Sequence, residues 1–196
     1  MAAMHRARRP WVPLLAALVA ATALHGCAAG RSDEPGAGAA QAGSGERARV
    51  DRVIDGDTLK VRLRDGRRRT VRVLGIDTPE TKRPDTPVEC GGPQASAAMA
   101  RLALSGSGYD AKGREVVLVS DPTGDQVDRF DRVLAYVEAG GRDLGEQQVA
   151  DGWAKMYAYQ GRRFQRRSRY ERAEREARSA GRGVHGECDG NFHSSR

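Results

Sequence analysis

The clearest strand and turn pattern in the chain lies at residues 53–66, which read VIDGDTLKVRLRDG. From Leu59 to Arg64, apolar and basic residues alternate, and this pattern predicts a β-strand with one buried face and one solvated face. Turn signals lie on both sides of this strand, Asp55-Gly56-Asp57 before it and Asp65-Gly66 after it. The stretch therefore predicts a strand paired with its sequence neighbours in an antiparallel sheet.

Similar signals on either side predict the remaining elements. Further strands are expected at residues 50–54, 71–76, 115–120 and 132–138. Helices are expected at residues 95–104, 144–153 and 168–180. Five short strands with a helix between the third and the fourth is the element order of an OB-fold. We therefore expect an α+β fold, namely a five-stranded OB-fold β-barrel with about three helices.

The composition bounds the architecture and several classes of function. The chain has 196 residues, 30% of them charged, and a net charge of +7. This length suits one domain with a short additional segment and excludes a multidomain machine, while so much charge excludes a polytopic membrane protein. The motifs Gly-x-Ser-x-Gly, Gly-x-Gly-x-x-Gly and the P-loop do not occur, so serine hydrolases and nucleotide-binding enzymes lose their usual signatures. The modest basic excess suits an anionic partner.

The N-terminal residues have the pattern of an export signal. Three arginines precede an apolar run at residues 11–24 that is too short to span a bilayer, which indicates a secretory signal peptide. The residues before Cys27 resemble the bacterial lipobox, so we expect residues 1–26 to be a lipoprotein signal peptide and Cys27 to carry the lipid. The alternative is a signal peptide that merely contains a cysteine. Either way we expect an extracytoplasmic protein, lipid-anchored to the bacterial cell membrane or secreted.

The limits of the folded domain follow from where hydrophobic periodicity begins and ends. Residues 27–49 comprise Cys27 and a segment rich in Gly, Ala, Ser and Arg, which is expected to be a flexible linker. Residues 50–188 are expected to form the domain, followed by a short C-terminal tail at residues 189–196. No obligate protein partner is evident, so a monomer is expected.

Two cysteines remain if Cys27 carries lipid. In an oxidising compartment, Cys90 and Cys188 are expected to form a disulfide. The alternative is a zinc site that adds His185 and His193 to the two cysteines. Both interpretations are structural rather than catalytic.

Acidic and basic residues at strand ends suggest chemistry on an anionic substrate. Asp57 and Asp77 could together bind a hard cation such as Ca²⁺ or Mg²⁺ through oxygen, although Asp57 alone would read as part of a tight turn. Arg72 lies in a predicted strand and Arg132 begins another. Two guanidinium groups beside such carboxylates would make a clamp for a phosphate, whereas without those neighbours Arg72 would read as a solvated outer-face residue.

Five blocks of sequence resemble the staphylococcal nuclease (thermonuclease) family. They are VIDGDT at 53–58, VRVLGIDTPETK at 71–82, GPQAS at 92–96, DRFDRVLAY at 128–136 and VADGWAK at 149–155. The resemblance covers residues 50 to about 186, in the order and spacing of the family. It implies an OB-fold, a Ca²⁺ site, and hydrolysis of DNA and RNA phosphodiester bonds that leaves 3′-phosphates.

The resemblance also implies roles for particular residues. Asp57, Asp77 and the backbone carbonyl of Thr78 would hold the calcium ion. Arg72 and Arg132 would grip the scissile phosphate, and Glu80 would orient or deprotonate the attacking water. The substrate would be contacted by a further group of side chains, Lys82, Arg129, Phe130, Tyr157 and Tyr159.

Two departures from the family concern the segment around Arg132. Asp131 and Val133 stand where the staphylococcal enzyme has glycines, which raises the question of how this loop aims Arg132. Phe130 replaces a tyrosine, so it can stack on a base but offers no hydroxyl.

Residues 162–182 contain nine arginines against three glutamates. They indicate either a solvated helix face with Glu–Arg pairs or additional contacts with phosphates or an anionic surface.

Three function classes are compatible with these residues. The first is a calcium-dependent extracellular nuclease with DNA or RNA as its substrate. The second is an inactive module of the same fold that binds nucleic acid without cutting it. The third, a calcium-binding surface lipoprotein, explains the carboxylates but not the arginines. The presence of every expected site residue favours the enzyme.

Overall fold

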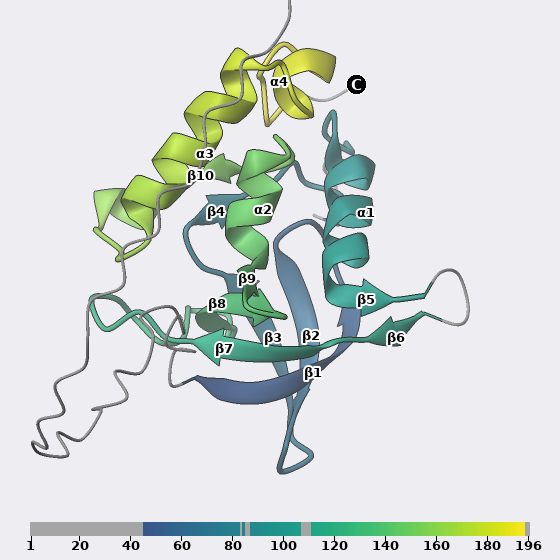
Figure 1. The fold of residues 1–196 in the computed structure, drawn as a ribbon, viewed down its shortest axis with the longest axis vertical. Helices are drawn as coiled ribbons and strands as arrows, with labels where there is room; N and C mark the ends of the chain where they lie inside the picture. The colour runs from purple at the N-terminus through teal and green to yellow at the C-terminus, as the bar shows by residue number, and fades with distance from the viewer. Residues whose placement is uncertain (1–44, 83, 85–86, 107–110, 195–196) are drawn as a thin grey trace, which may run out of the picture. The chain divides into compact units, whose positions relative to one another are not determined.

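The described part of the chain contains a closed five-stranded barrel. In the computed structural model, the described residues are 45–82, 84, 87–106 and 111–194. The barrel strands are β1 (Glu46–Val53), β2 (Thr58–Leu63), β3 (Arg68–Val73), β7 (Glu115–Val119) and β8 (Val133–Ala139). They pair in the order β3-β2-β1-β7-β8, and a parallel pairing of β3 with β8 closes the barrel (Figure 1). The expected α+β fold with an OB-type barrel is therefore confirmed.

The alternation read in the sequence accounts for the barrel core. Leu59, Val61 and Leu63 are buried, whereas Arg62 between them is exposed. The β2–β3 hairpin turns at Gly66, whose φ of 88° lies in the left-handed region that glycine adopts without strain. One face of each strand thus fills the barrel and the other carries charge.

Short strand pairs extend the barrel. β4 (Ile76–Asp77) pairs with β10 (Lys155–Met156), β5 (Leu104–Ser105) pairs with β6 (Lys112–Gly113), and β9 (Arg142–Asp143) extends β8. The single strand expected at 71–76 is instead broken. The chain turns at Gly75, whose φ is 83°, so that Ile76 and Asp77 leave β3 and pair with β10.

In the described ranges, three longer helices and one short helix lie to one side of the barrel strands (Figure 1). They are α1 (Gly92–Ala103), α2 (Leu144–Ala150), α3 (Arg167–Ser179) and α4 (Val184–Glu187), and a 3₁₀ turn lies at Tyr159–Gly161. The second helix ends before the expected residue 153. Gly152 has a φ of 77°, and a Cβ there would lie 2.1 Å from the carbonyl oxygen of Arg182, so the backbone leaves the helix at this close contact.

Both expected limits of the domain differ from the structure. β1 begins at Glu46 and pairs with β7 from that residue onward, so residues 46–49 belong to the barrel rather than to a linker. The segment after Cys188 is not a loose tail. Phe192 is only 5% exposed and packs with Cys90, Val184 and Cys188 in a second, smaller core.

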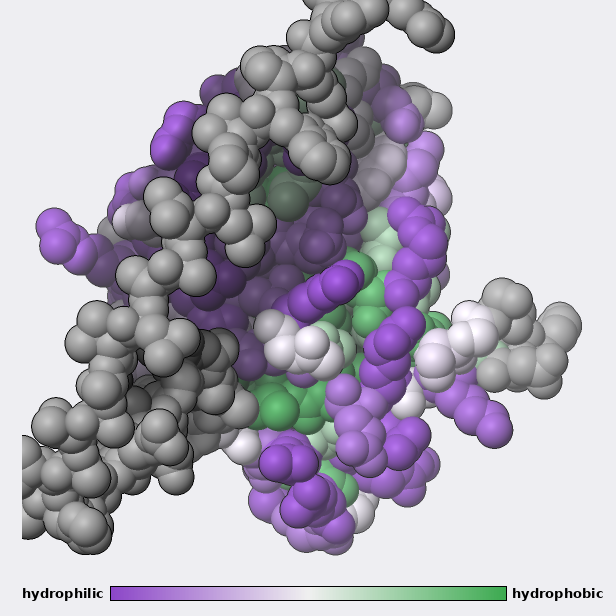
Figure 2. Space-filling view, viewed as in Figure 1, coloured by the Kyte–Doolittle hydropathy of each residue, from purple (hydrophilic) through white to green (hydrophobic). Residues whose placement is uncertain are grey.

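The arginine-rich segment is largely a face of ion pairs. Arg167 pairs with Glu171 at 2.7 Å, and Arg169 pairs with Glu146 of α2. Hydrophilic side chains accordingly predominate over α3, and a smaller hydrophobic area lies over the barrel (Figure 2). Arg172 and Arg175 form no ion pair with a described residue, so phosphate contacts by these two stay a prediction.

Several expectations concern residues outside the described ranges. The signal peptide, the lipid on Cys27 and the linker up to residue 44 all lie there. Within the ranges that the structure describes, none of the helices combines the length and the apolar character that crossing a bilayer requires.

Candidate active site

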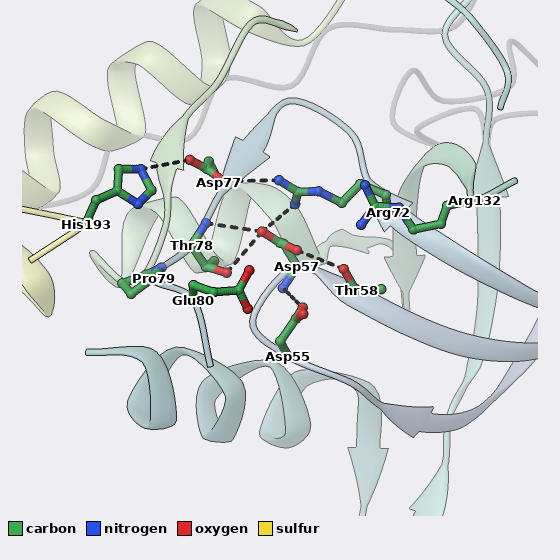
Figure 3. Close-up of a pocket in the computed structure, with 10 residues that line it drawn as sticks. All are labelled: Asp55, Asp57, Thr58, Arg72, Asp77, Thr78, Pro79, Glu80, Arg132 and His193. Atoms are coloured by element: carbon green, nitrogen blue, oxygen red, sulfur yellow. Dashed lines mark hydrogen bonds and ion pairs between the residues drawn. The ribbon is translucent and has the colours of Figure 1, made fainter. Parts of the chain in front are cut away.

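One cavity brings together the residues expected to act on the substrate. It has a volume of about 150 Å³ and lies at one end of the barrel (Figure 3). Its lining residues are Asp55, Asp57, Thr58, Arg72, Asp77, Thr78, Pro79, Glu80, Arg132 and His193. All six residues expected to be catalytic or metal-ligating are among them.

Closure of the barrel places the two arginines together. Arg72 lies in β3, and Arg132 directly precedes β8. The parallel register sets Val71 opposite Val133 and Arg72 opposite Leu134. Because alternate residues of a strand point to the same face, Arg72 and Arg132 project toward the same cavity.

Arg72 connects the two carboxylates expected to hold a cation. Its guanidinium contacts Asp57, and its Nη2 atom lies 3.1 Å from Oδ1 of Asp77. The Nη1 atom of Arg72 is buried, and it is the atom that forms the ion pair with Oδ2 of Asp57. A guanidinium has five N–H donors, so Arg72 can keep both carboxylates and still donate to an anion.

Asp57 is almost fully buried and held by several donors. Its carboxylate accepts hydrogen bonds from the backbone N–H of Thr78 at 3.2 Å, from the hydroxyl of Thr78 at 3.0 Å, and from the hydroxyl of Thr58 at 2.9 Å. From the sequence, the backbone carbonyl of Thr78 is expected to help hold the calcium ion. Its N–H and hydroxyl additionally fix the orientation of Asp57.

The turn before Asp57 is held from α2. The side-chain amide of Gln148 is fully buried and donates to the carbonyl oxygens of Gly56 at 2.8 Å and Ala95 at 3.0 Å. Gly56 is required because a Cβ there would lie 2.8 Å from the hydroxyl oxygen of Thr78. Burial, together with the neighbouring charge of Asp57, raises the pKa of Asp55 to about 6. Gln148 was not predicted, since a single glutamine in an amphipathic helix carries no distinctive pattern.

The loop before β8 aims Arg132. Asp128 accepts a hydrogen bond from the backbone N–H of Arg132 at 2.9 Å and another from its Nε at 2.7 Å. Asp131 has a φ of 58°, in the left-handed region where a glycine would sit without strain and where aspartate is tolerated better than most residues. Asp131 thus adopts a conformation compatible with the glycine of the family.

Glu80 is fixed by the loop that carries it. Its carboxylate accepts from the backbone N–H groups of Thr81 at 2.9 Å and Lys82 at 2.8 Å. The backbone N–H of Glu80 donates to the buried carboxylate of Glu89 at 2.6 Å. Glu89 was not predicted, because it lies in a loop without periodicity.

The five expected substrate contacts do not line the cavity. Lys82 is exposed beside Glu80, and the guanidinium of Arg129 lies 4.7 Å from the ring centre of Phe130. Phe130 itself is 63% exposed and lies next to Arg132, whose guanidinium is 5.4 Å from the ring centre. Tyr157 and Tyr159 are also exposed, and the backbone of Tyr157 bonds to Gly75, close to Asp77.

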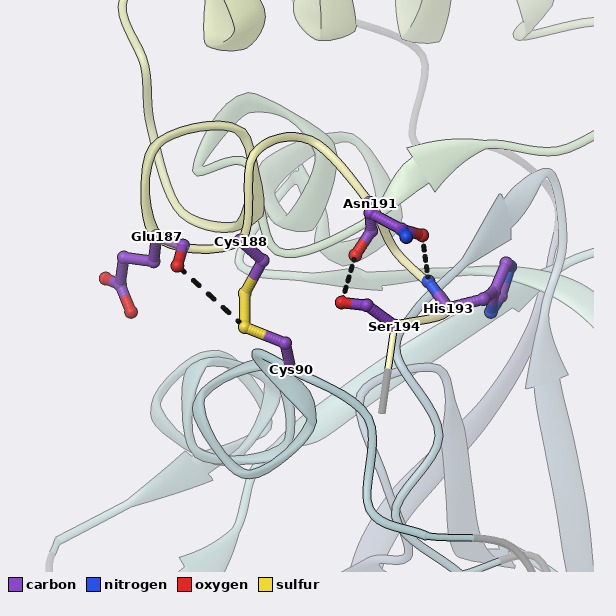
Figure 4. Close-up of a disulfide and its surroundings, with 6 residues drawn as sticks. All are labelled: Cys90, Glu187, Cys188, Asn191, His193 and Ser194. Carbon is purple, nitrogen blue, oxygen red and sulfur yellow. Dashed lines mark hydrogen bonds between the residues drawn. A yellow bond between two sulfur atoms is a disulfide. The ribbon is translucent and has the colours of Figure 1, made fainter. Parts of the chain in front are cut away.

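The two cysteines form a disulfide, and the alternative zinc group does not assemble. Cys90 and Cys188 are bonded (Figure 4). His185 packs edge-on against Phe192 with ring centres 5.3 Å apart, whereas His193 lies in the cavity with its Nε2 atom 3.2 Å from Asp77. The placement of His193 was missed because the sequence suggested only a tail or a zinc ligand.

The donor set of the cavity fits a hard divalent cation. Four carboxyl groups line it against two guanidinium groups, and the potential ligands of Asp57, Asp77 and Thr78 are all oxygens. Considering only the residues with described positions, no three His, Cys, Asp or Glu side chains are clustered as a preformed metal site. Calcium also takes waters and backbone carbonyls as ligands, so the oxygens of this cavity suit the chemistry of such an ion.

Comparisons with known proteins agree with this geometry. A model of the family "Staphylococcal nuclease homologue" matches residues 70–185. Endonuclease YncB of Bacillus subtilis is 38% identical over 112 residues, which cover 57% of this chain and 48% of that protein. The SPbeta prophage-derived endonuclease YokF of the same organism is 38% identical over 112 residues, 57% of this chain but only 34% of YokF. The Thermonuclease of Staphylococcus hyicus is 35% identical over 129 residues, 66% of this chain and 69% of that protein.

The match thus spans half or less of the two Bacillus proteins but more than two thirds of the S. hyicus protein. The family model covers strands β7 and β8, most of β3 and helices α1 to α3, including Arg72, Asp77, Glu80 and Arg132. On this evidence, the chain belongs to the family of staphylococcal nuclease homologues.

Proposed function

We propose that this protein is a calcium-dependent nuclease that hydrolyses phosphodiester bonds of DNA and RNA and leaves 3′-phosphates. The observation that carries the proposal is the convergence of Arg72 and Arg132 with Asp57, Asp77 and Glu80 in one small cavity. The N-terminal sequence supports action outside the cytoplasm, with the protein lipid-anchored through Cys27 or secreted. We further propose that it acts as a monomer.

The arginines would bind and stabilise the reacting phosphate. When water attacks phosphorus, the phosphorus becomes five-coordinate and negative charge builds on the phosphate oxygens. Arg72 and the terminal nitrogens of Arg132 line the cavity and can donate to those oxygens. Both side chains are already oriented by carboxylates, so little reorganisation accompanies the reaction.

Glu80 would position the water. Its carboxylate is held by two backbone N–H groups at the edge of the cavity and can accept a proton from the water that it aligns. A bond forms between the water oxygen and phosphorus, the bond from phosphorus to the 5′ oxygen breaks, and that oxygen takes up a proton. The 3′ oxygen keeps the phosphate.

Asp57, Asp77 and the carbonyl of Thr78 would hold the calcium ion. When bound there, calcium supplies positive charge close to the scissile phosphate. Arg72 contacts both carboxylates, so the phosphate-binding group and the cation-binding groups are mechanically linked.

The proposal is tested with the mature chain, from residue 27 onward and without lipid, on denatured DNA and on RNA. We expect digestion with Ca²⁺ and none after a calcium chelator is added. The products should carry 3′-phosphates that a phosphatase removes. Digestion that persists with chelator contradicts calcium dependence. Retention of labelled DNA without cleavage would instead identify an inactive binding module.

A further inference from the structure

The C-terminal segment Cys188–Ser194 returns to the cavity and is attached there at several points. The disulfide links Cys188 to Cys90, and the backbone N–H of Cys90 donates to the carbonyl of Ser194 at 2.7 Å. Between these attachments, the buried ring of Phe192 packs in the second core. The backbone is therefore fixed on both sides of His193 (Figure 4).

The loop that precedes His193 is also ordered by its own hydrogen bonds. The side-chain oxygen of Asn191 accepts from the backbone N–H of His193 at 3.1 Å, and the backbone carbonyl of Asn191 accepts from the hydroxyl of Ser194 at 3.3 Å. Such a local turn restricts where the imidazole can point. His193 is thus presented to the cavity by a built element rather than by a loose chain end.

The imidazole lies between two carboxylates from different parts of the site. Its Nδ1 atom is 3.1 Å from Oε2 of Glu89. Its Nε2 atom is 3.2 Å from Oδ2 of Asp77, a contact drawn in Figure 3. Lys155 completes the arrangement, since its Nζ lies 2.6 Å from Nε2 of His193 and 3.5 Å from the same Asp77 oxygen. With Nδ1–H donating to Glu89, Nε2 can accept from Lys155, which in turn pairs with Asp77.

Each of these carboxylates controls a different part of the proposed machinery. Asp77 is a proposed calcium ligand. The carboxylate of Glu89 accepts a hydrogen bond from the backbone N–H of Glu80, the residue proposed to position water. His193 is therefore the side chain through which the C-terminal segment contacts both the cation site and the Glu80 loop.

We infer that His193 is a positioning residue, held in place by the Cys90–Cys188 disulfide, that sets the Asp77 carboxylate and the Glu80 loop relative to each other. This inference rests on the proposed function. It assigns to the C-terminal segment a part in the site, and it makes the activity dependent on an intact disulfide. Removing a side chain that hydrogen-bonds to a metal ligand and orients it typically lowers metal affinity or activity by about 10- to 100-fold.

The test uses His193→Ala, His193→Gln and His193→Asn in the mature chain. Calcium affinity is measured by calorimetry without substrate, together with kcat, KM and the thermal midpoint. We expect His193→Ala to weaken calcium binding and to lower kcat, each by about 10-fold, with little change in KM. The amide of Gln reaches the place of Nε2 and should restore calcium affinity, whereas the amide of Asn reaches the place of Nδ1 and should restore kcat.

His185→Gln is the matched control. His185 belongs to the same disulfide-linked region but packs on Phe192 and contacts neither carboxylate, so its replacement should leave calcium affinity and kcat unchanged. Calcium affinity and kcat of His193→Ala that stay within about twofold of the parent would overturn the inference, since the expected effect is at least fivefold larger. So would a loss in all His193 variants that follows the thermal midpoint and that neither amide restores.

Reduction of the disulfide provides a second test. A reducing agent should lower the kcat of the parent by about 10-fold, but should add little to the loss already present in His193→Ala, because both changes remove the same contact. If the reducing agent lowered kcat by the same factor in the parent and in His193→Ala, the link between the disulfide and His193 would be contradicted. The Cys90→Ser/Cys188→Ser double variant gives the same comparison without reductant.

The two proposals fail in different ways. A parent chain that digests neither DNA nor RNA removes the proposed function. A parent that digests nucleic acid but whose activity and calcium affinity are indifferent to His193 removes only the present inference.

Discussion

The carboxylate of Asp128 holds Arg132 at two points, through its backbone N–H at 2.9 Å and through its Nε at 2.7 Å. The Nε contact fixes the plane of the guanidinium, and the terminal nitrogens form no hydrogen bond with a described residue. Arg132 therefore faces the cavity with its terminal donors available. The neighbouring Asp131 adopts a left-handed φ that allows the chain to make this tight loop.

We expect Asp128→Ala to reduce kcat by about 100-fold, because a displaced guanidinium no longer meets the phosphate at the right angle. Steady-state kinetics with a defined oligonucleotide measures the effect. Asp125→Ala is a matched control in the same loop, since Asp125 forms an exposed pair with Arg162 and its removal should change little. Equal effects of the two substitutions would refute an orienting role for Asp128.

Arg72→Lys should lower kcat by about 100-fold or more while leaving substrate affinity nearly unchanged. Lysine keeps the positive charge but cannot bond two oxygens at once with a planar group. Binding is measured with labelled DNA in the presence of chelator, and turnover is measured with calcium. Arg62→Lys, an exposed position on the neighbouring strand, serves as the control. Normal turnover in the lysine variant would remove Arg72 from the phosphate-binding role.

Calcium should stabilise the fold as well as support turnover. At a concentration 100 times its dissociation constant, a ligand that binds only the folded state adds about 2.7 kcal/mol to the free energy of unfolding. Urea unfolding with calcium and with chelator measures this gain, which Asp77→Asn should largely abolish. A gain that survives in Asp77→Asn would show that calcium binds elsewhere.

Gln148→Met should destabilise the protein by about 1–3 kcal/mol, since it leaves the carbonyl of Gly56 without this buried donor and removes a second bond to Ala95 in α1. Because Gly56 precedes Asp57, calcium affinity should fall as well. The adjacent Gln147→Met removes only a bond to Asp151 at the helix end and is expected to change stability by less than about 1 kcal/mol. Similar losses in both variants would argue against a specific role of Gln148.

Acid stability should depend on Asp121, which is 2% exposed. Burial alone would raise the pKa of this carboxyl, but hydrogen bonds from Thr123, Tyr136 and the backbone of Gln165 outweigh burial and lower the pKa below its usual value of 3.8. A lowered folded-state pKa stabilises the fold above the unfolded value and loses that contribution as the pH falls through the folded value.

Asp121→Asn should therefore destabilise the protein by about 2–3 kcal/mol at pH 7. The difference between the free energies of unfolding of the variant and the parent should shrink as the pH falls below 3.8. Urea unfolding at several pH values measures both effects. A difference that is constant across the acid range would contradict the linkage.

The elements that sequence alone predicted are those specified by local patterns. The alternation at Leu59, Val61 and Leu63 and the turn at Gly66 depend only on near neighbours along the chain, and they led to the correct barrel. The expected site residues could be identified from motifs, and the structure gathers them in one cavity. Their roles remain predictions that the variants test.

The parts that sequence could not supply depend on contacts between distant segments. Gln148 reaches the Gly56 turn from α2, and His193 reaches Asp77 from the end of the chain. Neither pairing follows from spacing or periodicity, because tertiary packing alone decides which segments meet. The break of the third strand at Gly75 is of the same kind, since it depends on the distant partner strand β10.

The parallel pairing of β3 with β8 has a consequence for when the molecule becomes active. Arg72 and Arg132 are neighbours only across this seam, which joins strands far apart in the chain. Pairings of this kind form late, because a long loop must be ordered before they are gained. A partly folded chain in which this seam has not formed thus carries both arginines without bringing them together. Under the proposed function, the time at which cleavage recovers during refolding would report when β3 and β8 pair.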